Sequence, residues 1–149
     1  MDLAAISDAL AARYAANVTT APTGYKAITG STAKPPNNIP NTPYVIVWPQ
    51  SGDLEYNPGQ RAGEHHFQVV FYYAKAEGDI PREYAALEKW LGVLLDRTHG
   101  QLQLTLAPVV VKAWPVHWEI GSAVYGGDTY EVIIISITVY TRENVTLVS

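Results

Sequence analysis

The chain contains no cysteine, which excludes disulfide bonds, thiol catalysis and zinc sites built on cysteine ligands. Charge is also sparse: charged residues make up 16% of the 149 positions, and ten Lys and Arg against fourteen Asp and Glu give a formal net charge of -4. A negative chain is poorly suited to binding phosphate backbones, so sequence-specific nucleic-acid binding is not expected. Stability must come from apolar packing or oligomerisation, and the composition is compatible with a reducing cytoplasm.

Long apolar runs are missing too. No stretch approaches the roughly 20 consecutive apolar residues that a membrane span requires. The first fifteen residues carry Asp2 and Arg13 among alanines and lack the basic start and apolar run of a secretory signal. Because hydrophobic residues make up 48% of the chain, we expect a single domain over residues 1–149 with a substantial core, and no membrane partner.

The sequence also lacks the common catalytic motifs: it contains no Walker loop, dinucleotide fingerprint, G-x-S-x-G or H-E-x-x-H. His65 and His66 are adjacent in a predicted strand, so their side chains point to opposite faces and cannot readily share a metal ion. His99 is expected at a helix end and His117 on a sheet face, neither with a recognisable triad partner. The sequence therefore predicts no catalytic residue, no cofactor, no metal and no enzyme activity.

What is present is a regular alternation of helical and β-type segments. Asp2 can cap a helix over residues 2–16, in which apolar residues recur at spacings of three and four. A second helix is predicted over residues 80–98, with Asp79 as its cap and Trp90 near the edge of its apolar stripe. Both helices are expected to pack on a sheet.

β-favouring residues predict four strands, over residues 44–48, 64–74, 109–120 and 129–141. Turn residues are dense in the two connecting segments, which are predicted to be long exposed hairpin loops over residues 49–63 and 121–128. The predicted fold is therefore α+β: a single domain with a mostly antiparallel four-stranded sheet packed by two helices, in the order α-β-β-α-β-β.

Alternation within the strands assigns their faces. In the second strand the better core face is formed by His65, Phe67, Val69, Phe71 and Tyr73. In the third strand one face is assigned to Val110, Trp114, Val116, Trp118 and Ile120. Pro115 indicates an edge position or a bulge for this third strand, because proline cannot donate to a central ladder.

Residues 19–43 contain five prolines, which interrupt any helical or ladder pattern and predict an extended irregular arm. A segment of this length is either a solvated linker or a functional element. Aromatic residues are numerous for so small a domain, with ten Tyr and four Trp. Because aromatic side chains are enriched at protein interfaces, this composition indicates a binding surface.

A capped N-terminal helix and a Pro-rich stretch precede Tyr44-Val45-Ile46-Val47, and a long loop leads to Glu64-His65-His66-Phe67-Gln68-Val69. A central helix and an Ile-rich hairpin follow, the last strand running from Tyr130-Glu131-Val132 to Tyr140-Thr141-Arg142. Over nearly the whole chain this layout resembles the tail terminator proteins, also called tail completion or minor tail proteins, of long-tailed bacteriophages.

The resemblance implies a structural protein of the virion tail or neck, present in the host cytoplasm during assembly. It implies a homo-oligomeric ring, a hexamer, that caps the tail tube, stops its polymerisation and provides the surface for head-tail joining. The implied partners are further copies of the chain, the tail tube protein and the head-closure or connector protein, with DNA passing through the ring. No cofactor is implied.

We expect the contacts of such a ring in the two hairpin loops. The predicted interface residues are Asp53, Leu54, Glu55, Tyr56, Arg61, Val124, Tyr125 and Asp128. The arm before Pro43 is a further candidate to contact a neighbour. Two other classes remain open: a head-closure or connector adaptor of the phage neck, and a small ligand-binding module or enzyme, which would need a deep pocket with convergent polar groups.

Overall fold

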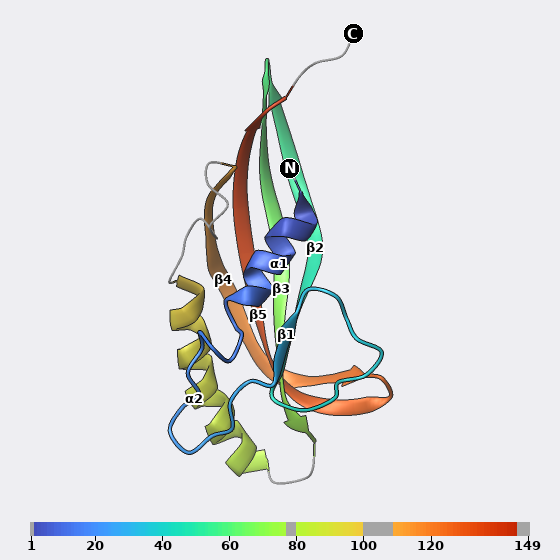
Figure 1. Cartoon of the computed structure of the whole chain (residues 1–149), viewed down its shortest axis with the longest axis vertical. Coiled ribbons are helices and arrows are strands. Elements are labelled where there is room, and N and C mark those ends of the chain that lie inside the picture. Colours follow the sequence, from blue (N-terminus) through green and yellow to red (C-terminus); the bar gives the residue numbers. More distant parts are fainter. Residues whose placement is uncertain (1, 77–79, 100–108, 146–149) are drawn as a thin grey trace.

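The structure, a computed structural model, describes residues 2–76, 80–99 and 109–145. Its elements follow one another as α1 (Leu3–Ala12), β1 (Gly30–Thr32), β2 (Tyr44–Asn57), β3 (Gln60–Lys75), α2 (Ile80–His99), β4 (Val110–Tyr125) and β5 (Asp128–Asn144). The strands form one twisted sheet in the order β1-β2-β3-β5-β4. β1 runs parallel to β2, and the other neighbours are antiparallel. Figure 1 shows the sheet as the long axis of an elongated molecule.

The prediction of a four-stranded antiparallel sheet is wrong, because a fifth strand makes the sheet mixed. β1 has only three residues, a Gly, a Ser and a Thr, and lies inside the Pro-rich arm. Such a segment carries no apolar alternation, so it is recruited by the edge of β2, where it pairs with residues from Tyr44 to Ile46. The two helices and the four long strands do follow the predicted order.

Both predicted hairpin loops are also wrong: they are mostly strand. β2 continues to Asn57 and β3 begins at Gln60, so only Pro58 and Gly59 turn the chain. β4 and β5 are likewise joined by Gly126 and Gly127 alone, both with positive φ. The strands extend into these segments although most of their side chains are exposed, because backbone pairing with a neighbouring strand requires no buried face.

The helices pack on one face of the sheet. Asp2 caps α1 as predicted, since its Oδ1 accepts hydrogen bonds from the amides of Ala4 at 2.9 Å and Ala5 at 3.3 Å. The helix ends at Ala12, earlier than predicted, and the cap assigned to Asp79 lies outside the described residues. Trp90 is not at the edge of the α2 stripe: it is fully buried, with its ring 4.8 Å from that of Phe71.

Beneath the helices lies the main core. The face predicted for β3 is confirmed: Phe67, Val69 and Phe71 are buried there, against residues of both helices and of β5. The face predicted for β4 is only partly right: Val110, Trp118 and Ile120 lie opposite core-facing positions of β5, but register shifts at Val110/Lys112 and Pro115/His117 break the alternation. Ala113, and not Trp114, therefore joins Val110 in the main core, while Val116 and Trp118 remain exposed on the edge strand. Pro115 does lie on an edge strand beside a bulge, as predicted.

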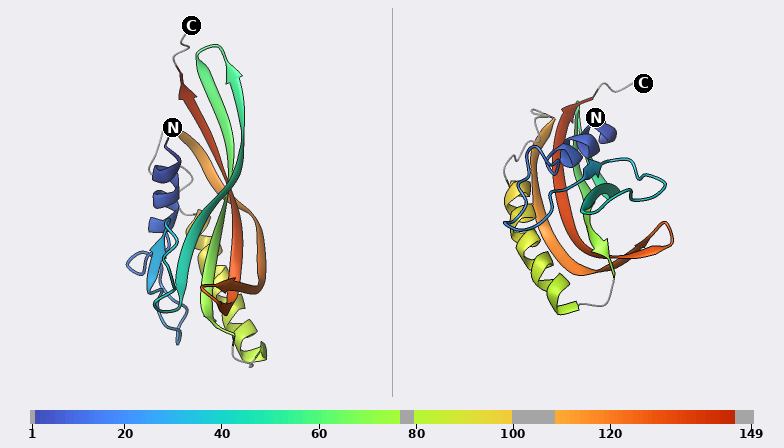
Figure 2. Two further views of the ribbon diagram at one scale, coloured as in Figure 1. Left: turned by 90° about the vertical axis from the view of Figure 1, so that its right-hand side faces the viewer. Right: turned by 60° about the horizontal axis from the view of Figure 1, so that its bottom comes forward.

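The opposite face carries a smaller core at the base of the sheet. Its buried members are Tyr44, Ile46, Val70, Tyr72, Tyr130 and Val132. The arm over residues 19–43 packs here against the sheet of its own chain. Ile39 packs on this cluster, and the carbonyl oxygen of Pro36 accepts a hydrogen bond from Tyr125 Oη. Figure 2 shows that the β2–β3 hairpin extends beyond both helices at the other end of the sheet.

Candidate interaction surfaces

The β2–β3 hairpin brings together the first five predicted interface residues. Leu54 and Tyr56 are 48% and 60% exposed and lie on the face of the sheet that the helices cover further down. Asp53 and Glu55 alternate with them and point to the opposite face. Arg61 is the direct cross-strand partner of Tyr56. The tip of the hairpin therefore presents an apolar side and an acidic side.

Arg61 fixes this hairpin to the end of β5. Its Nε donates to Glu143 Oε1 at 2.7 Å, and its Nη2 forms an ion pair with the same oxygen. The hydrogen bond with Glu143, followed by one with Tyr56, raises the pKa of the Arg61 guanidinium. Arg61 therefore joins β3 to β5 and also holds the aromatic ring at the tip, rather than standing free for a partner.

Two glycines and a histidine build the floor at the base of the hairpin. A Cβ at Gly52 would lie 2.8 Å from His65 Nδ1, and one at Gly63 would collide with His65 Nε2 and lie 2.7 Å from Thr141 Oγ1. Burial lowers the pKa of His65, as do Arg61 and then His66 nearby. His65 is 6% exposed, and its Nε2 lies 3.1 Å from Thr141 Oγ1. Sequence reasoning missed this glycine cradle, formed by Gly52, Gly63 and His65. The glycine on each of β2 and β3 was the signal that could have revealed it.

Beside the cradle lies an open apolar groove of about 360 Å³. Leu3 of α1 and Leu54 of the hairpin form its two rims, and His65 and Phe67 lie between them. Both leucines are close to half exposed. The groove has no convergent set of charged groups among its lining residues, so it offers packing surface rather than reaction chemistry.

The β4–β5 hairpin carries the other three predicted interface residues, but only one is fully available. Val124 is 71% exposed. Tyr125 is occupied within the chain, with its ring 5.6 Å from Tyr72 and its hydroxyl bonded to the arm. Asp128 lies 3.4 Å from Lys75 Nζ in an exposed ion pair. The two groups of predicted residues thus lie at opposite ends of the molecule (Figure 1) and form two surfaces, not one site.

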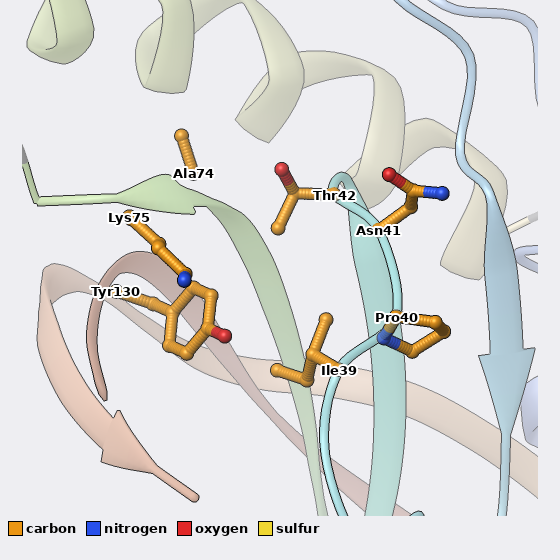
Figure 3. A pocket seen from close by; sticks show the side chains of 7 residues that line it. All are labelled: Ile39, Pro40, Asn41, Thr42, Ala74, Lys75 and Tyr130. Carbon is orange, nitrogen blue, oxygen red and sulfur yellow. The ribbon is translucent and has the colours of Figure 1, made fainter. Parts of the chain in front are cut away.

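A second open cavity, of about 390 Å³, lies near this lower end. Figure 3 shows residues 39–42 of the arm on one side and Ala74, Lys75 and Tyr130 of β3 and β5 on the other. Lys75 is the one charged group in this lining, and Asp128 already neutralises it. The lining residues include no histidine, cysteine or carboxylate.

The outer edge of β4 is a third surface. β4 is the last strand of the sheet, so no described strand covers its outer backbone groups. Four of its large apolar side chains are exposed: Val111, Val116, Trp118 and Val124. An edge of this kind favours association with another chain. Sequence reasoning predicted an edge position or a bulge for this strand from Pro115, and assigned Val116 and Trp118 to one common face.

Two further properties bear on function. Within residues 2–76, 80–99 and 109–145, no three His, Cys, Asp or Glu side chains gather as ligands for a metal ion. Across the same segments, no helix combines the length and apolarity needed to cross a membrane.

No protein-family model matches the chain, and comparison with curated proteins also gives no match.

Proposed function

We propose that the chain is a structural ring subunit that terminates a bacteriophage tail. The observation that supports this function is the distribution of exposed apolar side chains. Among the described residues, nine large apolar side chains are exposed, and six of them lie on two strands, two on β2 and four on β4. The two residues of β2 lie at the projecting tip of the β2–β3 hairpin, and the four of β4 lie along the uncovered edge of the sheet. Surfaces of both kinds favour protein association.

In this proposal the two ends of the sheet have different partners. The β2–β3 hairpin contacts the last ring of the tail tube, and the opposite end of the sheet faces the head-closure protein. Head-to-tail contacts between identical copies close the ring, and six copies form it. Polymerisation stops because the cap binds the tube at one end and offers no tube-like surface at the other.

Native mass spectrometry and negative-stain microscopy of the full chain at high concentration test ring formation. We expect a closed oligomer with a central channel. A chain that stays monomeric at every concentration and does not bind isolated tail tubes contradicts the proposal.

Inactivating the gene in the phage that encodes the chain tests the role itself. We expect overlong, uncapped tails in electron micrographs, because nothing arrests tube growth. Tails of normal length that fail to join heads would identify a head-closure adaptor instead. Normal virions would contradict both roles.

A further inference from the structure

One row of side chains crosses the sheet from edge to edge and carries opposite charges at its two ends. Successive cross-strand partners in this row are Asp53 of β2, Glu64 of β3, Tyr140 of β5 and Lys112 of β4. Because directly paired residues in a sheet share a face, all four side chains lie on the face away from the helices.

At the β2 end of the row, Asp53 and Glu64 place two carboxylates directly opposite each other. Like charges in this position are destabilising. The β2 edge is open here, since β1 pairs only with residues from Tyr44 to Ile46. Within the described segments Asp53 makes no ion pair, and the imidazole of His66 lies 3.9 Å from the carboxylate of Glu64. This edge lacks a cation.

At the β4 end of the row, Lys112 is held in place without a carboxylate. Its Nζ lies 4.3 Å from the ring centre of Trp114 and 4.7 Å from that of Tyr140. Such contacts orient an ammonium group but leave room for an anion. In the part of the chain that the structure describes, no acidic side chain forms an ion pair with Lys112.

The strand directions make these two ends compatible between copies. β2, β3, β5 and β4 alternate in direction along the sheet, so β4 runs antiparallel to β2. Two copies placed side by side in the same orientation therefore bring the β2 edge of one against the β4 edge of the next as an antiparallel pair. In this arrangement Asp53 and Lys112 lie at the same level.

The prolines define how far such a pair can extend. Pro49 and Pro115 also share one row, through Phe67 and Ile137, and each lies beside a register shift. Neither edge has an amide donor in that row. The shared ladder is therefore confined to residues 51–54 of β2 and 110–114 of β4. Below it, the exposed Val116 and Trp118 of β4 contact the neighbour by packing alone.

We propose that copies of the chain associate through these two edges, with Asp53 of one subunit paired to Lys112 of the next. The inference rests on the proposed ring and names the contact that closes it. The occupant of each edge is a second copy, because one chain carries both the acidic edge and the basic edge, in the same row and with matching polarity. Edges on opposite sides of a sheet give head-to-tail contacts, as a ring requires.

Charge reversal tests the pair in the full chain. Asp53→Lys and Lys112→Asp should each weaken self-association roughly tenfold or more in sedimentation velocity, because each places like charges together in the contact. The double variant should restore association. Asp8→Lys and Lys89→Glu, which reverse exposed charges on the two helices, outside the row, are the matched controls and should change nothing.

A folding readout separates a lost contact from a lost fold. Asp53→Lys removes the repulsion with Glu64, so its melting temperature should equal or exceed that of the unaltered chain while its association weakens. Single variants that associate normally, or a double variant no better than either single one, overturn the inference.

Cysteine cross-linking gives an independent measurement, since the chain has no cysteine of its own. Directly paired antiparallel residues have Cα atoms about 4.5–5.5 Å apart, within the range that a disulfide spans. A chain carrying both Asp53→Cys and Lys112→Cys should oxidise to a ladder of covalent oligomers. An equal mixture of the two single variants should stop at a covalent dimer containing one of each.

The outcomes distinguish the inference from the proposed function. Covalent dimers of either single variant alone indicate two-fold contacts and overturn the inference. Rings that persist in native mass spectrometry without cross-linking, and without sensitivity to charge reversal, overturn this contact and leave the ring intact. A chain that is monomeric at all concentrations and never cross-links overturns both.

Discussion

The two halves of the long sheet share the same strands but not the same surroundings. In the lower half, Val45, Phe71 and Ile133 stand side by side across three strands and are fully buried under the helices. Some ten residues further along β2, Leu54 and Tyr56 lie on the same face and are about half exposed. The lower half supplies the apolar burial that stabilises the fold. The upper half is held by backbone pairing and a few polar contacts, which leaves its side chains available for partners.

The largest effect on stability is expected from truncating the lower half at Trp90. Its side chain is fully buried against Phe71, so Trp90→Ala should lower the free energy of unfolding by about 3–5 kcal/mol. Denaturant titration followed by circular dichroism measures the change. Glu88→Ala, at an exposed position of the same helix, is the control and should change little. Equal effects of the two substitutions would mean that α2 is packed differently.

In the upper half the corresponding weak point is the glycine cradle. Gly63→Ala should cost about 1–3 kcal/mol, since the added Cβ collides with His65 and crowds Thr141. Gly121→Ala on β4 is the control, because a Cβ there meets nothing within 4 Å. Combining Gly63→Ala with His65→Ala should recover part of the loss. A cost that is unchanged in the double variant would exclude the collision as its cause.

The accuracy of the sequence predictions also differs between the two halves, because burial leaves an apolar pattern in the sequence and exposed backbone pairing does not. In the lower half apolar periodicity correctly predicted that both helices exist, and the alternation around Phe67 and Val69 correctly predicted the buried face of β3, since burial is what produces these patterns. It misplaced Trp90, which is fully buried and not at the edge of the apolar stripe of α2. β1 was missed because three small residues carry no pattern. The upper strands were predicted as loops because exposed paired backbone does not select apolar residues.

The surroundings of the interface residues depend on distant partners that no local pattern reveals. Tyr125 is hydrogen-bonded to Pro36, and Arg61 is paired with Glu143, each more than eighty positions away. The bulges around Pro115 similarly shifted the face of β4. Pro115 indicated an edge position or a bulge, but the position and number of inserted residues follow from the pairing of β4 with β5.

The pH dependence of the upper half should come from His65. Burial holds its pKa below the usual value of 6.5, so the folded chain binds fewer protons there than the unfolded chain. Its contribution to stability is therefore full above about pH 6.5 and decreases as the pH falls through that value toward the folded pKa. Melting temperatures at pH 7.5 and pH 5 should differ less for His65→Gln than for the unaltered chain. Identical pH profiles for His65→Gln and the unaltered chain would rule out His65 as the source.

The smallest effect on stability, and a large one on assembly, is expected from shortening the β2–β3 hairpin. Removing Glu55 and Tyr56 together with their partners Ala62 and Arg61 deletes two β2–β3 pairs and the two pairs that Ala62 and Arg61 make with β5, and keeps the Asn57–Gln60 turn. Because two residues leave each strand, every remaining side chain keeps its face. The loss of the exposed Glu55 and Tyr56 and of the partly buried Arg61–Glu143 ion pair should cost about 1 kcal/mol.

The same shortened chain should fail to cap tail tubes, since it lacks the tip that the proposal places against the tube. Binding to isolated tubes and tail length in electron micrographs measure this loss, with Val18→Ser, at an exposed apolar residue outside the hairpin, as the control. A shortened chain that folds and still gives tails of normal length would contradict this role of the hairpin. The hairpin would then contribute only to the sheet, and the β4 edge would be the principal contact surface.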